Sequence, residues 1–130
     1  MRERILIVSD EQQNASMRES LAQDGFSVTV ADDDQDGYGQ LLESSFDLVI
    51  VNLSDSMTGR RLVKQIRANP QLRGLLILTV AEWGTGQPTM ALTEGADGFE
   101  PSPVDRRRLM AAVTRLLEPN LTMTARAKRG

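Results

Sequence analysis

Cysteine and histidine are both absent from the chain. Without cysteine there is no disulfide framework, no thiolate zinc site and no cysteine nucleophile, which is typical of proteins in a reducing compartment such as the cytoplasm. Without histidine, Ser-His and Cys-His catalysis, imidazole metal ligands and a phosphohistidine within this chain are excluded. Much of ordinary enzyme chemistry is therefore ruled out before any motif is considered.

Long apolar runs and a strong charge of one sign are also lacking. No run approaches the ~20 apolar residues that a membrane-spanning helix needs, and the N-terminus MRERILIV lacks the long apolar core and cleavage site of a signal peptide. The net charge of -3 gives no general reason to expect nucleic-acid binding. A chain of 130 residues suits one domain with its own core. We therefore expect one cytoplasmic domain without membrane or direct nucleic-acid contacts.

Short apolar runs alternate with amphipathic stretches along the chain, which predicts βαβ units. The predicted strands are residues 5–8, 26–30, 47–51 and 75–80, with a short fifth strand at 98–100. Three of these runs are apolar throughout, as strands covered by helices on both faces must be. The sequence therefore predicts an α/β fold: a (βα)5 doubly wound, parallel five-stranded sheet of flavodoxin-like topology.

Helices are predicted between the strands from 3.6-residue periodicity. They are residues 11–24, 34–44, 59–68 and 88–94, and a last helix that follows Pro103 and ends at Leu117. Gly25 is placed to end the first helix, whereas Gly37 and Gly39 each weaken the second by about 1 kcal/mol relative to alanine. No periodicity follows the last helix, so we expect a domain at 1–118 and a tail or the start of a linker at 119–130.

Any chemistry should lie at the carboxyl ends of the strands, where ligands of doubly wound sheets bind. Those ends carry Ser9-Asp10, Asn52, Ala81 and Ser102. The acidic run from Asp32 to Asp36 has no calcium-loop spacing. We interpret it as a solvated turn and helix start, where negative charge suits the helix dipole.

Three segments, RILIVSDE, FDLVIVNL and EGADGFEPSP, resemble in order and spacing the response regulator receiver domain of two-component signalling. The resemblance covers residues 3–118. It implies a first strand that ends in two Mg²⁺-binding aspartates and a third strand that ends in the phosphate-accepting aspartate. It also implies a Thr or Ser at the end of strand four and a Lys-Pro pair after strand five. The face of helix four, strand five and helix five would meet an output domain or a second copy of the chain.

The residues at these family positions differ from the family pattern. The two acids match Ser9 and Asp10, the phosphoacceptor matches Asn52, and the lysine matches Ser102. Counting without gaps places the hydroxyl position on Ala81; Thr79 would match only if strand four were shifted, and we favour Ala81. The resemblance is therefore to a degenerate receiver, or pseudo-receiver.

These four differences would each weaken phosphorylation chemistry at this site. A carboxylate can hold phosphate as an acyl phosphate, whereas the neutral amide of Asn52 is too poor a nucleophile. With Asp10 as the only remaining acid, Mg²⁺ binding should be weak or absent. We expect a phosphorylation-independent protein-interaction module that is not an enzyme and has no cofactor. The alternative role of Asn52 is to cap its strand and hydrogen-bond loop amides.

Two other functions stay open. The first is a phosphorylatable receiver that uses a non-standard acid, Asp55 or Asp10. The second is a flavodoxin-like cofactor binder, although SDEQQNAS after strand one lacks the glycine of a phosphate-binding loop.

Candidate interaction residues lie in the second half of the chain: Trp83, Met90, Phe99, Arg106 and Arg107. Trp83 is either a binding anchor or a lid packed over the vacated pocket. Phe99 matches the family's aromatic switch position, and without a hydroxyl at position 81 we expect one fixed rotamer. The arginines form either a docking patch or an ordinary exposed helical turn.

Overall fold

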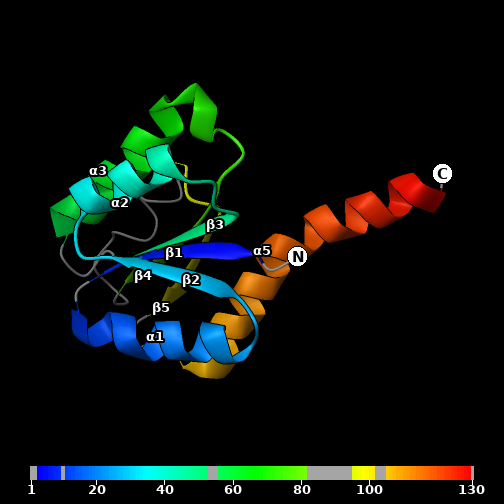
Figure 1. Ribbon diagram of the computed structural model, residues 1–130, viewed down its shortest axis with the longest axis horizontal. Helices are drawn as coiled ribbons and strands as arrows, with labels where there is room; N and C mark the ends of the chain where they lie inside the picture. Colours follow the sequence, from blue (N-terminus) through cyan, green and yellow to red (C-terminus); the bar gives the residue numbers. More distant parts are fainter. Residues whose placement is uncertain (1–2, 10, 53–55, 82–94, 102–104, 130) are drawn as a thin grey trace.

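The computed structural model describes residues 3–9, 11–52, 56–81, 95–101 and 105–129. Five parallel strands form one sheet in the order β2-β1-β3-β4-β5 (Figure 1). The strands are β1 (Arg4–Val8), β2 (Ser27–Ala31), β3 (Leu48–Asn52), β4 (Leu76–Ala81) and β5 (Gly98–Pro101). This order confirms the predicted doubly wound, flavodoxin-like sheet.

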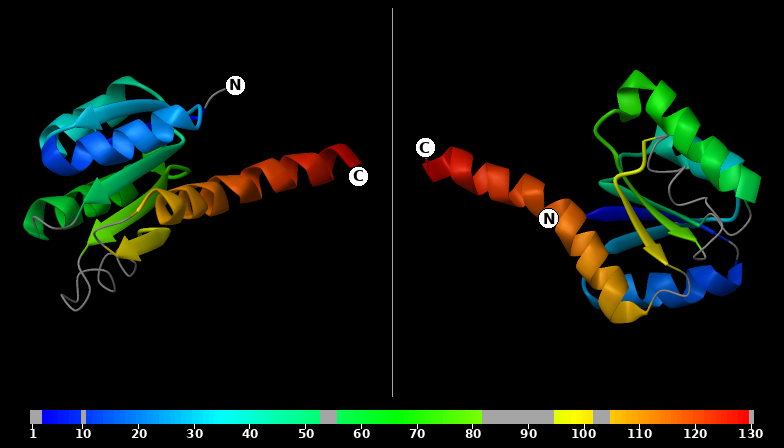
Figure 2. Two further views of the ribbon diagram at one scale, coloured as in Figure 1. Left: turned by 90° about the horizontal axis from the view of Figure 1, so that it is seen from below. Right: turned by 180° about the vertical axis from the view of Figure 1, so that it is seen from behind.

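Helices cover both faces of the sheet. They are α1 (Glu11–Gln23), α2 (Asp34–Glu43), α3 (Ser56–Ala68), the 3-10 helix η1 (Pro70–Leu72) and α5 (Arg106–Arg129). Figure 2 shows α2 and α3 on one face and α1 and α5 on the other. The helix predicted at 88–94 lies outside the described residues.

Alternate residues of the central strands enter two separate cores. On the α2/α3 face the core contains Leu6, Val8, Val49, Val51, Ile77, Leu62, Val63 and Ile66. On the α1/α5 face it contains Ile5, Ile7, Leu48, Ile50, Leu78, Val80, Met17, Leu21, Leu109 and Val113. Because both faces are buried, both sets of alternating positions are largely apolar, which explains the long apolar runs; Thr79 of β4 is a buried polar residue among them.

Helix ends follow local chemistry. Gly25 has a φ of 94°, in the left-handed region that glycine adopts without strain, and the N–H of Phe26 donates to the carbonyl of Leu21. Gly25 therefore ends α1, as predicted. The carboxylate of Asp33 caps α2 by accepting from the N–H of Asp36 at 2.8 Å. This confirms that the acidic run begins a helix, but Asp34 is buried and not solvated as predicted.

The last helix is longer than the sequence analysis predicts. It continues past Leu117 to Arg129, and its final turns project beyond the sheet (Figure 1). Apolar periodicity marks only the part of a helix that packs on a core, so a helix can continue beyond the end of its apolar stripe. Among the described residues, no helix is both long enough and apolar enough to cross a membrane.

Candidate functional site

The carboxyl ends of β1 and β3 lie side by side where the winding of the sheet reverses. β1 has β2 on one side and β3 on the other, and its last residue, Val8, pairs with Val51. The next residues, Ser9 and Asn52, therefore stand level at the edge of the sheet. This is the place at which doubly wound sheets bind ligands. Two of the predicted site residues are thus brought together.

A hydrogen bond joins these two side chains. The Asn52 amide Nδ2 donates to the Ser9 Oγ at 2.9 Å. The backbone N–H of Ser9 donates in turn to the carbonyl of Ala31 at 3.2 Å, which ties the end of β1 to β2. Asn52 is 9% and Ser9 6% exposed. The buried pair is neutral, and a bond of this kind contributes about 1 kcal/mol to stability.

Strand β4 supplies the third neighbouring strand end. Val80 pairs with Asn52, so Ala81, one residue further, is the last residue of the strand, and it is buried. Thr79 is fully buried, and its Oγ1 donates to the carbonyl of Gly98 at 3.0 Å. The hydroxyl proton of Thr79 therefore takes part in a hydrogen bond that joins β4 to β5. The assignment of the family's hydroxyl position to Ala81, and not to Thr79, stays a prediction.

Acidic groups are scarce in this part of the site. Ser9, Asn52 and Ala81, at the ends of β1, β3 and β4, are all uncharged. Within the described residues, no group of three or more acidic, histidine or cysteine side chains could hold a metal ion. Asp10, Asp55 and Ser102 lie outside the described residues. The weak or absent Mg²⁺ binding therefore stays a prediction.

Comparison with known proteins identifies the fold family. The sequence pattern of the response regulator receiver domain matches residues 5–114. The chain belongs to this family. It is thus a receiver domain of two-component signalling, as the three sequence segments indicated.

Relatives of this receiver domain include a response regulator, MprA, and a transcriptional regulatory protein, CpxR. MprA of Mycolicibacterium vanbaalenii is 28% identical over 116 residues, which cover 88% of this chain and 50% of that protein. CpxR of Escherichia coli K12 is 29% identical over 116 residues, covering 88% and 49%. The receiver domain therefore spans about half the length of these curated relatives.

A solved structure shares the fold of this receiver domain. It is that of a putative response regulator from Chloroflexus aurantiacus, which superposes with a TM-score of 0.83 at 24% identity. The superposition covers 91% of this chain and 99% of that one.

Phe99, at the family's aromatic switch position, lies on β5. It pairs in register with Thr79 and is partly buried against the core of the α2/α3 face. Trp83 and Met90 lie outside the described residues. Their predicted binding roles are therefore untested.

The two predicted arginines of the receiver's last helix differ in their contacts. Arg106 pairs with Asp24 across the α1/α5 side at 3.0 Å, with 54% of its side chain exposed, whereas Arg107 is simply exposed. The sequence analysis missed Asp105, whose Oδ1 accepts from the N–H of Arg108 at 2.8 Å. This N-terminal carboxylate offsets the unfavourable positive charge at that end of α5. An aspartate directly before a predicted helix was the signal.

Arg67, at the end of α3, forms a network that the sequence analysis also missed. Its Nε donates to the carbonyl of Gly95 and its Nη1 to that of Leu75, both at 2.8 Å. Its Nη2 pairs at 2.7 Å with Asp97, whose Oδ2 also accepts from the N–H of Ile77. Arg67 therefore fixes the residues before β5 against the start of β4.

Proposed function

We propose that this receiver domain signals without aspartyl phosphorylation and acts as a protein-interaction module, not as an enzyme. The observation that carries the proposal is the buried hydrogen bond from Asn52 to Ser9. An amide nitrogen whose lone pair is delocalised into its carbonyl is a poor nucleophile for phosphorus. This nitrogen also donates the hydrogen bond to Ser9. It therefore presents an N–H group, and not a free electron pair, to its surroundings.

The surrounding residues support the same proposal. A transferred phosphoryl group carries close to two negative charges, which need cationic or hydrogen-bonding partners. Ala81 provides no hydroxyl, and the hydroxyl of Thr79 is bonded to Gly98. By sequence, Ser102 stands where the family has lysine. A phosphoryl group on this edge would therefore meet less compensation than in an ordinary receiver.

The partner of this receiver domain would be an output domain or a second copy of the chain. The family resemblance favours the face that contains β5 and α5. On this face Arg115 of α5 and Glu100 of β5 are 3.9 Å apart, and Arg107 is exposed. The partner, like the activity of any longer protein that contains this domain, is part of the proposal.

Phosphorylation chemistry provides the test. The wild-type domain is incubated with acetyl phosphate and Mg²⁺, and its intact mass is followed; in parallel, Trp83 fluorescence is followed with beryllofluoride. We expect neither a phosphoryl mass gain nor a fluorescence change. A variant that carries Ser9→Asp, Asn52→Asp, Ala81→Thr and Ser102→Lys restores the family pattern and serves as the positive control. Asn52→Asp alone should stay unphosphorylated, because the other groups are still missing.

A mass gain on the wild-type domain would show the proposal to be wrong. In that case, Asp55→Asn and Asp10→Asn variants would identify the acid used. Loss of the gain in one of them would assign the phosphoacceptor and establish the alternative receiver that uses a non-standard acid.

A further inference from the structure

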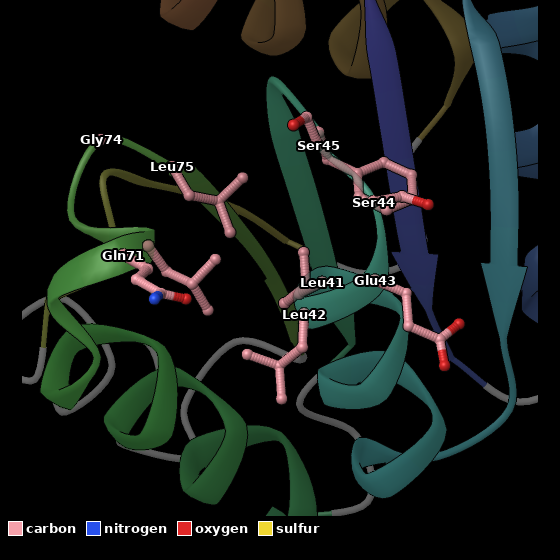
Figure 3. A pocket seen from close by; sticks show the side chains of 10 residues that line it. Leu41, Leu42, Glu43, Ser44, Ser45, Gln71, Gly74 and Leu75 are labelled. Carbon is pink, nitrogen blue, oxygen red and sulfur yellow. The ribbon is translucent and has the colours of Figure 1, made fainter.

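A cavity of about 370 Å³ lies at the amino edge of the sheet, opposite the end that carries Asn52 and Ser9. It lies between the C-terminal end of α2 and the segment that runs from η1 to β4 (Figure 3). Its lining residues belong to two short segments, 41–46 and 71–75. This volume is at the lower end of the range of small-molecule sites, about 300–1,000 Å³.

Part of the wall of this amino-edge cavity is aliphatic, while polar atoms make up the larger share of its exposed lining. Figure 3 shows Leu41 and Leu42 on the α2 side and Leu75 with Gln71 on the opposite side. Leu42 is 53% exposed, and among the described residues it is the large hydrophobic side chain that is exposed to solvent. Leu41 and Leu75 continue its apolar surface inward, where both are buried. An alkyl chain placed between the walls would cover Leu42 and remove apolar surface from water.

The rim of the cavity at the end of α2 is electronegative. The N–H of Ser44 bonds to the carbonyl of Gln40, but the carbonyls of residues 41–43 accept no backbone hydrogen bond from the described residues that follow. Such carbonyls carry the negative end of the helix dipole, which basic side chains usually offset. The last turn of α2 has no basic residue and contains Glu43. The ten lining residues include no lysine or arginine.

A cation already occupies the nearby aromatic face. The Arg4 guanidinium lies 4.9 Å from the centroid of the Phe46 ring, which lines the cavity. A ligand cation would therefore not stack on Phe46, and the open acceptors are the carbonyls at the end of α2. A ligand with an alkyl chain against Leu42 and a positive group at the end of α2 would therefore match both the apolar and the electronegative part of this cavity.

We propose that this cavity binds a primary alkylammonium group, with its chain between Leu42 and Leu75 and its ammonium at the C-terminal carbonyls of α2. The same chemistry is offered by a free alkylamine and by a lysine side chain. The site is independent of the proposed function, because it lies at the other end of the sheet from Asn52 and would exist in a phosphorylated receiver as well.

Ligand titration followed by ¹H–¹⁵N NMR spectra of the whole chain tests the proposal. The probe is n-hexylammonium, with n-hexanol and hexanoate as matched neutral and anionic chains. We expect saturable shifts centred on residues 41–46 and 71–75. Because a charged donor to these carbonyls and the helix dipole should both contribute, hexanol should bind about fivefold to tenfold more weakly. Hexanoate should not bind. Equal binding of hexylammonium and hexanol, or shifts centred elsewhere, would overturn the proposal.

Variants locate the site. Glu43→Lys places a competing ammonium at the end of α2, and Leu42→Ser removes the apolar wall; both residues are exposed, so the fold should persist. Each should weaken hexylammonium binding severalfold. Glu19→Lys makes the same charge change on α1 and should leave binding unchanged. If both cavity variants bind as tightly as the wild-type domain, the proposal is overturned.

A second probe distinguishes the two sources of the group. Nα-acetyl-lysine methylamide carries the lysine side chain without the charged α-amino and α-carboxyl groups of the free amino acid. If this probe shifts the signals of the same residues and binds more tightly than hexylammonium, the source is a lysine of another protein. If hexylammonium alone binds, the source is a free amine.

Discussion

Two glycines of α2, Gly37 and Gly39, should respond in opposite directions to replacement by alanine. A Cβ added at Gly37 would lie 2.8 Å from the Cγ2 and 3.5 Å from the Cγ1 of Val8, and 3.7 Å from the Cβ of Ala31. A Cβ added at Gly39 would meet no heavy atom within 4 Å. Gly37 is therefore the point at which α2 packs directly on the sheet, whereas Gly39 only weakens its helix.

The expected magnitudes follow from these distances. Alanine in place of glycine stabilises a helix interior by about 0.5–1 kcal/mol. Gly39→Ala should show this gain, which corresponds to a rise in Tm of about 2–4 °C for a domain of this size. In Gly37→Ala the same gain is opposed by overpacking of about 1–3 kcal/mol, because Val8 is β-branched and its χ1 is stiff. We expect a net loss of about 1–2 kcal/mol.

Urea unfolding at constant m-value measures both effects. The decisive control is the Val8→Ala background, which removes both methyl groups that the new Cβ would meet. There, Gly37→Ala should become stabilising, like Gly39→Ala. If Gly37→Ala already stabilises the wild-type domain as much as Gly39→Ala does, close packing of α2 on β1 is not what requires glycine, and the reasoning fails.

Three further predictions concern polar groups. Arg67→Lys should lower the free energy of unfolding by about 1–3 kcal/mol, because an ammonium cannot reach all of the acceptors that the guanidinium fork bonds; combining it with Asp97→Asn in a double-mutant cycle should reveal coupling between the two. Asp105→Ala should cost about 1 kcal/mol through loss of the cap of α5, whereas Asp105→Asn should retain most of it, as urea unfolding would show. Asn52→Asp should destabilise the domain in chelator and regain little stability with Mg²⁺; full recovery at millimolar Mg²⁺ would contradict the expected weak metal binding.

The strands could be predicted from the sequence because burial on two faces leaves an unmistakable pattern. The run at 47–51 corresponds to β3 at Leu48–Asn52 within one residue. Helix ends were less accurate. The start of α3 at Ser56 is three residues before the predicted one, because the apolar stripe of Leu62, Val63 and Ile66 marks only the part of the helix that packs on the sheet.

The site could be predicted as a place, but not as a set of contacts. Topology alone brings Ser9 and Asn52 to the same edge, whereas their hydrogen bond depends on the strand register and on side-chain rotamers. Arg67 is harder still. It lies at the border of the apolar stripe of α3, one turn after Val63, with its side chain 22% exposed, and its acceptor at Gly95 is a backbone carbonyl 28 residues away. Every residue has a backbone carbonyl, so no residue pattern could have indicated the bonds to Gly95 and Leu75.

The neutral pair at the ends of β1 and β3 fits the proposed function without aspartyl phosphate, for which Asp10 alone remains of the three acids that the family resemblance implies. Neighbouring carboxylates at one buried edge repel one another, and without a cation each also loses hydration. Asn52 and Ser9 hydrogen-bond each other instead, with no charge to compensate. Both cores of the sheet are made of apolar side chains, so the fold does not depend on charge at this edge. In the function that we propose, phosphotransfer is not required, and an amide and a hydroxyl would then be the more stable pair at this edge of the sheet.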